Sequence, residues 1–162
     1  MPKEPSGRIY RNALEFYNLA APAFDDNAIL IASPNAVVCN LALCVELLLK
    51  CSDSGVKVPL HQEGEVLANA EIFSNLKGGG HDLEKMFNKM DKEIAGQLCV
   101  LYHECTGGDL QVELTKCKDY FVHARYAYEL NSAHAYNVSA IKQLADGLIK
   151  ALLKGWGPSE PA

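Results

Sequence analysis

Residues 35–51, NAVVCNLALCVELLLKC, form the most apolar stretch of the chain, and they restrict the folds that it can adopt. Ser33 and Pro34 come just before, and these residue types favour the N-cap and the first position of a helix. The pattern predicts a helix from Ser33–Pro34 to about Cys51, ended by SDSG at 52–55. Because this helix is apolar nearly all round, we expect it at the centre of a helical fold.

Helical periodicity recurs along the rest of the chain, whereas the alternation typical of strands is not sustained. His81 and Glu84 have capping-box spacing at the start of one helix, whose apolar stripe is Leu83, Met86, Phe87, Met90 and Ile94. We expect a short helix or turn within 65–76, and a final helix that Gly155 ends. The predicted helices cover about 6–20, 23–31, 33–51, 81–90, 93–105, 109–130 and 137–154.

We therefore predict an all-α fold, an up-and-down bundle of five to seven helices. The 162 residues suit one domain, 1–162, with loose ends at about 1–6 and 156–162. Hydrophobic residues make up 49% of the chain, which is enough for a full core.

The charge is evenly spread, with a net value of −5. Residues 1–80 hold 6 basic and 9 acidic side chains, and residues 81–162 hold 9 and 11. Neither half is basic, so the overall field does not favour nucleic acid, although a local basic patch stays open.

Six cysteines are present, and they form no C-x-x-C pair. Cys44 and Cys51 are seven apart and could share a buried face. We expect reduced thiols in a cytoplasmic protein, with no metal site and no cofactor. No apolar run reaches the roughly 20 residues of a membrane span, since Asn40 and Glu46 interrupt 36–49, so we expect no membrane partner.

Glu46 is unusual, because it places a charged side chain in the middle of the apolar helix predicted over 33–51. A buried carboxylate without a partner costs several kcal/mol or takes up a proton. One interpretation is an i, i+4 pair with Lys50 at a helix edge. The other is that Glu46 faces another helix, is mostly buried, and meets Arg125 or His81 there.

Arg125 is one of three arginines, and it lies beside Tyr126 in FVHARYAYEL at 121–130. Arginine suits a bidentate bond with a carboxylate, so a pair with Glu46 is one interpretation and a surface pair with Glu129 is the other. His81 and Asp82 follow three glycines, where a helix start could bind an anion. Histidine there could instead be a cap or a core hydrogen-bond donor.

Three segments resemble the HEPN-like helical domains of prokaryotes: CVELLLKC at 44–51, GGHDLEKMF at 79–87 and ARYAYE at 124–129. The resemblance spans roughly residues 30–154. It implies an all-α bundle that is usually a homodimer, and many members act in toxin–antitoxin, phage-defence or RNA-processing systems. Active members are metal-independent ribonucleases that use an R-x4-6-H motif.

This chain lacks that motif, because eight residues separate Arg125 from His134. We therefore assign no catalytic residue. The leading expectation is a non-catalytic HEPN-like domain that binds a nucleotide, RNA or a protein partner near Glu46, Lys50, His81, Asp82, Arg125 and Tyr126. The alternatives are a divergent metal-independent ribonuclease, with Arg125 meeting His81, His123 or His134 by tertiary contact, and a structural oligomeric bundle.

Overall fold

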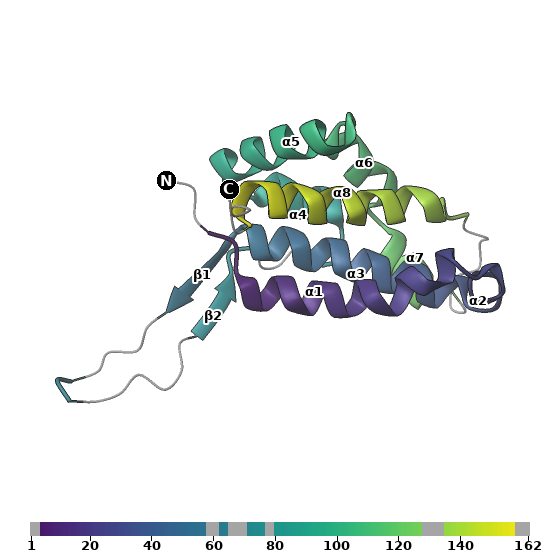
Figure 1. The fold of residues 1–162 in the computed structure, drawn as a ribbon, viewed down its shortest axis with the longest axis horizontal. Helices are drawn as coiled ribbons and strands as arrows, with labels where there is room; N and C mark the ends of the chain where they lie inside the picture. Colours follow the sequence, from purple (N-terminus) through teal and green to yellow (C-terminus); the bar gives the residue numbers. More distant parts are fainter. Residues whose placement is uncertain (1–3, 58–61, 65–70, 77–79, 128–134, 158–162) are drawn as a thin grey trace, which may run out of the picture.

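The computed structural model describes residues 4–57, 62–64, 71–76, 80–127 and 135–157, and helices dominate them (Figure 1). The predicted all-α class is confirmed, with one small addition of β-structure. The elements are α1 (Gly7–Ala20), the 3₁₀ turn η1 (Ala21–Phe24), α2 (Asn27–Ala32), α3 (Pro34–Ser52), β1 (Ser54–Lys57), β2 (Glu71–Ser74), α4 (Leu83–Lys89), α5 (Lys92–Thr106), α6 (Leu110–Cys117), α7 (Tyr120–Arg125) and α8 (Val138–Trp156).

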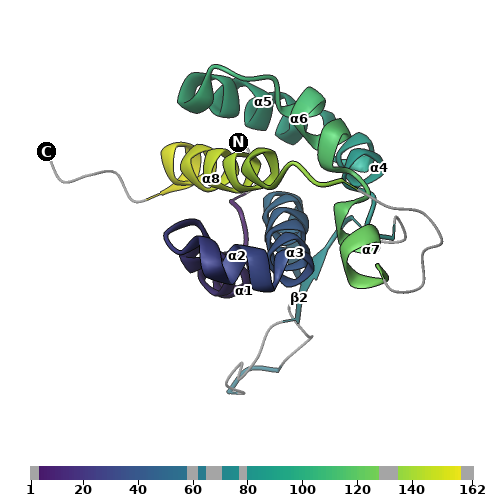
Figure 2. The same ribbon diagram turned by 90° about the vertical axis from the view of Figure 1, so that its right-hand side faces the viewer.

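The four long helices lie roughly along one direction and alternate in sense (Figure 1). The chain runs one way in α1 and α5 and the opposite way in α3 and α8. Figure 2 shows α8 between α5 on one side and the α1–α3 pair on the other, with α7 beside α3. The long helices thus pack in an up-and-down order, and the shorter α4, α6 and α7 close one side.

Helix α3 is the centre of the core, as its composition predicts. It contacts α1, α7 and α8, and its apolar residues Val38, Leu41, Val45, Leu48 and Leu49 are almost fully buried. With 19 residues and a mean hydropathy of 1.5, α3 is long and apolar enough to cross a membrane by length and composition alone, contrary to the expectation from 36–49. Burial among three helices accounts for the same composition, since a core helix and a spanning helix are equally apolar.

Several helix ends differ from their predicted positions. Asp82, not His81, is the N-cap of α4, because its Oδ1 accepts a hydrogen bond from the Lys85 amide at 2.9 Å. Ile94 belongs to α5 rather than to the preceding stripe, since the chain turns extended at Met90 and Asp91 caps α5.

Two further boundaries were predicted wrongly. The helix expected over 109–130 is divided into α6 and α7 around Lys118 and Asp119. Helix α8 does not end at Gly155 but continues to Trp156. Gly155 instead lies against Leu101 of α5, where an added Cβ would clash with the leucine side chain.

The segment expected to be a short helix or turn within 65–76 contains strand β2, and residues 65–70 lie outside the described part of the chain. β1 and β2 pair antiparallel, with Ser54 opposite Ser74 and Lys57 opposite Glu71. Asp53 fastens this ribbon to the helices, because its carboxylate accepts hydrogen bonds from Asn75 Nδ2 at 2.7 Å and from the Asp91 amide at 3.0 Å.

The six cysteines are free thiols. Cys44 and Cys51 are both buried, as their spacing suggests, and Cys117 is buried too. Burial raises the pKa of each of these three thiols to about 12, because a thiolate would lose its hydration. They are therefore core residues rather than reactive nucleophiles.

Candidate functional site

Glu46 occupies the middle of α3 with only 4% of its surface exposed. Its Oε1 lies 2.6 Å from Lys50 Nζ, and its Oε2 lies 2.7 Å from His81 Nδ1. Both interpretations of Glu46 thus describe part of the structure: the i, i+4 pair with Lys50 is formed, and so is a cross-element contact with His81. Two partners offset the cost of burying this carboxylate.

The Glu46 contact determines which nitrogen of the His81 ring acts as a hydrogen-bond donor. A carboxylate only accepts hydrogen bonds, so His81 Nδ1 must be the nitrogen that donates to it. The other ring nitrogen, Nε2, makes no hydrogen bond to any residue that the structure describes. The His81 side chain is 40% exposed, so the imidazole links a buried anion to the protein surface.

Phe121 fixes the plane of the His81 ring. The centroids of the two rings are 3.9 Å apart, at an angle of 41°. Phe121 is buried at the second position of α7, and α7 packs on α3. The glycine before His81 has a left-handed backbone (Gly80, φ 60°), which a residue with a side chain rarely adopts. The imidazole is therefore positioned by a turn, a carboxylate and an aromatic ring.

Arg125 does not form the predicted pair with Glu46. Between these two described residues there is no ion pair within 4 Å, and the alternative partner Glu129 lies outside the described residues. The guanidinium carbon instead lies 5.7 Å from the Phe121 ring centroid and 5.6 Å from that of Tyr126. α7 ends at Arg125, so this exposed side chain folds back over its own helix rather than reaching α3.

Of the six predicted residues, Lys50 and His81 each contact Glu46. Phe121 connects His81 to Arg125, and Arg125 in turn lies over the Tyr126 ring. Asp82 does not join the cluster, because its carboxylate caps α4 and lies 3.8 Å from Lys85 Nζ. The sequence analysis did not identify Phe121 as the residue that links the others. Its spacing of four residues from Arg125 on one helix is the signal that could have identified it.

The described cluster holds two cationic side chains, although the whole chain is acidic. Lys50 and Arg125 are the cations, and among the residues that the structure describes Glu46 is the carboxylate that pairs with Lys50 and His81. Lys50 is 28% exposed and Tyr126 is 37% exposed. The exposed Arg125 therefore reaches the surface beside the ring of Tyr126, in a protein whose net charge is −5.

The neighbouring polar groups are occupied in other contacts. Lys118 pairs with Glu84 at 3.2 Å, and Lys116 with Glu113 at 2.9 Å. Within the described part of the chain, no group of three or more histidine, cysteine, aspartate or glutamate side chains is arranged to hold a metal ion.

No protein-family model, no curated protein and no solved structure matches this chain.

Proposed function

We propose that the chain is a non-catalytic HEPN-like domain that binds a phosphate-bearing ligand, a nucleotide or RNA, at the surface formed by Lys50, His81, Arg125 and Tyr126. The observation that supports this most is the exposed Arg125 beside the partly exposed His81. Among the described residues neither Arg125 nor His81 Nε2 has a hydrogen-bonded partner on the surface side. A group that only fastened helices together would be expected to use this bonding capacity internally.

The chemistry of the surface matches phosphate and base. A protonated imidazole donates from Nε2, and a guanidinium presents planar donors, both of which suit phosphate oxygens. Tyr126 and the guanidinium plane offer faces on which a base can stack. Glu46 would hold His81 in place for this contact while it balances the charge of Lys50.

Binding is tested by fluorescence anisotropy with a labelled RNA oligomer, together with thermal shift in a panel of nucleotides. We expect Arg125→Ala to weaken RNA binding by about 1–3 kcal/mol and to lower the salt dependence by about one phosphate contact. Arg11→Ala, which removes an exposed arginine from α1, is the matched control and should bind like the parent. Equal binding by the parent and Arg125→Ala would reject the assigned site.

A ribonuclease is the second candidate, and the Nδ1 contact of His81 favours it. A neutral imidazole whose Nδ1–H is held by a carboxylate has the lone pair of Nε2 available to accept a proton. Nε2 would take the proton of an RNA 2′-hydroxyl, and the 2′-oxygen would attack phosphorus. The bond to the 5′-oxygen would break, that oxygen would gain a proton from solvent, and a 2′,3′-cyclic phosphate would remain. Arg125 would offset charge on the phosphate.

RNA cleavage separates the two candidates. Mixed RNA is incubated with the parent protein, His81→Ala and Arg125→Ala in the presence of a chelator. Cleavage that both substitutions abolish would favour the ribonuclease, whereas binding without cleavage would favour the non-catalytic domain. A homodimer in the cytoplasm belongs to the same proposal, and sedimentation or light scattering tests the dimer.

A further inference from the structure

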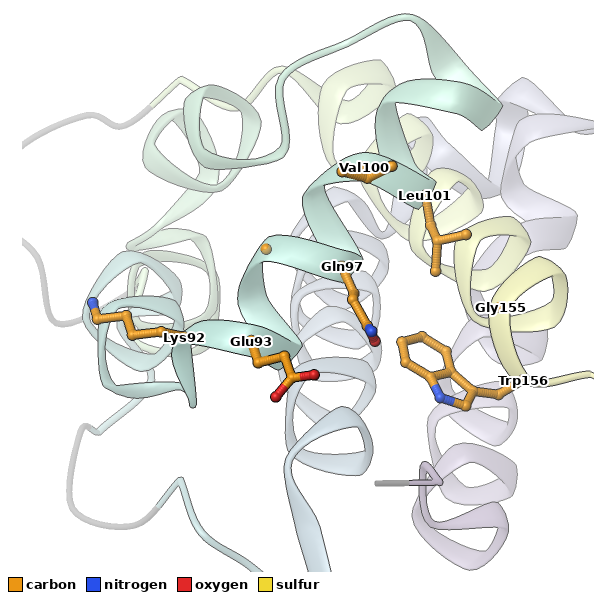
Figure 3. Close-up of a pocket in the computed structure, with 8 residues that line it drawn as sticks. Lys92, Glu93, Gln97, Val100, Leu101, Gly155 and Trp156 are labelled. Carbon is orange, nitrogen blue, oxygen red and sulfur yellow. The ribbon is translucent and has the colours of Figure 1, made fainter. Parts of the chain in front are cut away.

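A groove of about 500 Å³ lies between α5 and the end of α8, on elements that the proposed phosphate site does not use (Figure 3). Its size is in the range of small-molecule sites. Most of its wall is apolar, and the residues that matter for its chemistry are Glu93, Gln97, Val100, Leu101 and Trp156.

Two glycines shape the groove. Gly155 brings α8 against the Leu101 side chain, because any Cβ at position 155 would overlap that side chain. On the facing helix, the position of a Cβ at Gly96 is open, with no atom within 4 Å. Close helix contact at one glycine and missing side-chain volume at the other leave an open space beside the indole of Trp156.

The polar groups at the groove are not used inside the protein. The side chains of Glu93, Gln97 and Trp156 form no hydrogen bond or ion pair with any residue in the described ranges. In Figure 3 the Glu93 carboxylate and the Gln97 amide point toward the Trp156 ring, whereas Lys92 extends away from it. The nearby Lys154 is paired with Glu104 at 2.7 Å.

We propose that this groove binds a small organic cation with alkyl groups on its nitrogen. The indole face attracts a cation through the negative side of its π-system, and alkyl groups fill the apolar wall formed by Val100 and Leu101. The Glu93 carboxylate supplies the opposite charge and disfavours an anion. Gln97 can hydrogen-bond to a hydroxyl or carbonyl elsewhere on the ligand.

The chain has a single tryptophan, Trp156, so its fluorescence reports directly on the groove. The full chain is titrated with choline, with 3,3-dimethyl-1-butanol as an uncharged molecule of the same shape, and with potassium chloride as a salt control. We expect a saturable change in Trp156 emission with choline alone. Glu93→Gln should weaken choline binding about threefold to tenfold, since a charged partner is lost.

Glu15→Gln removes an exposed carboxylate from α1 and serves as the matched charge control, with unchanged affinity expected. The absence of a saturable response to choline would overturn the proposal. An equal response to the uncharged alcohol, or an equal loss of affinity in Glu93→Gln and Glu15→Gln, would also overturn it, because recognition of the cation would then not depend on this groove.

Discussion

Two carboxylate clusters of this protein are built on the same plan and differ in what they leave exposed. On α3, Glu46 pairs with Lys50 and with His81. On α8, Asp146 pairs with Lys142 at 2.7 Å and accepts a hydrogen bond from the Tyr17 hydroxyl at 2.6 Å. Each cluster thus combines a lysine four residues away with a ring from a distant element.

The surroundings of the two clusters are different. The Lys142 ammonium is covered by the rings of Tyr17 and Phe24, at 5.1 and 5.5 Å, and the cluster joins α8 to α1. Beside Glu46, the ring of His81 reaches the surface next to the exposed Arg125. An acid–lysine pair at i, i+4 is therefore common to both clusters, and they differ in whether neighbouring polar groups reach the surface.

Phe121→Ala should give the largest effect on the α3 cluster. Phe121 is fully buried and supports the His81 ring, so we expect a loss of about 3–4 kcal/mol in the free energy of unfolding. Phe24→Ala, at the half-buried ring beside Lys142, is the matched change in the other cluster and should cost less. Urea denaturation followed by circular dichroism measures both, and an equal loss would contradict the assigned roles.

Glu46→Gln should come next, at about 2 kcal/mol, because the neutral amide loses the charge-assisted hydrogen bond to Lys50 and can bond His81 only after the ring changes tautomer. Asp146→Asn should cost only about 1 kcal/mol, since the Asp146 side chain is 30% exposed against 5% for Glu46. The same urea series tests the order. A larger loss for Asp146→Asn would show that burial of the carboxylate does not decide the difference.

Tyr17→Phe should cost about 1 kcal/mol near neutral pH through the lost hydrogen bond. Burial, with the Asp146 hydrogen bond as a second cause, raises the pKa of Tyr17 above its usual value. The folded state then holds the proton more strongly than the unfolded chain, so this stability is complete below about pH 10 and is lost as the pH rises through the folded pKa.

The Tyr17→Phe variant should therefore show a flatter decline in the free energy of unfolding above pH 10 than the parent. The decline will not vanish, because burial raises the pKa of Tyr102 to about 12 and contributes in the same direction. Parallel declines in the parent and the variant would mean that Tyr17 does not contribute to the loss of stability above pH 10.

Lys50→Met should have the smallest effect, about 0.5 kcal/mol or less, because Lys50 is partly exposed and His81 continues to hold Glu46. His81→Ala is the informative comparison, and we expect it to cost more, since it removes the contact between α3 and the start of α4. Thermal unfolding of the two variants measures the difference. A greater loss of stability in Lys50→Met than in His81→Ala would mean that the local pair of Glu46 and Lys50, and not the contact with His81, stabilises the protein.

The sequence was sufficient for the central helix, because a long apolar run with a start signal predicts both the helix and its burial. A glutamate within that run also predicted a buried carboxylate with a partner, and the His81 contact confirms this part. The sequence did not decide whether Glu46 meets Arg125 or His81, because that choice depends on the tertiary packing of α7. The helix ends at Arg125 and directs the guanidinium over Phe121.

The β-ribbon could not be predicted for a related reason. β1 and β2 have four residues each, too few to show alternation, and their pairing joins residues 14 to 20 positions apart. The break between α4 and α5 did have a local signal. Asp91 accepts hydrogen bonds from the amides of Glu93 and Ile94, as an N-cap aspartate does, but the apolar periodicity continues across it.

The most direct test of the proposed phosphate site is an NMR titration of the imidazole C–H signals with a nucleotide or short RNA. The chain has five histidines, and His81→Asn assigns the signal of His81. We expect the His81 signals to shift in a saturable way. Those of His103, whose Nδ1 lies 3.2 Å from the Gly108 carbonyl oxygen at the end of α5, should stay in place. An unchanged His81 signal at saturating ligand, or equal shifts at both histidines, would contradict the assignment of this surface.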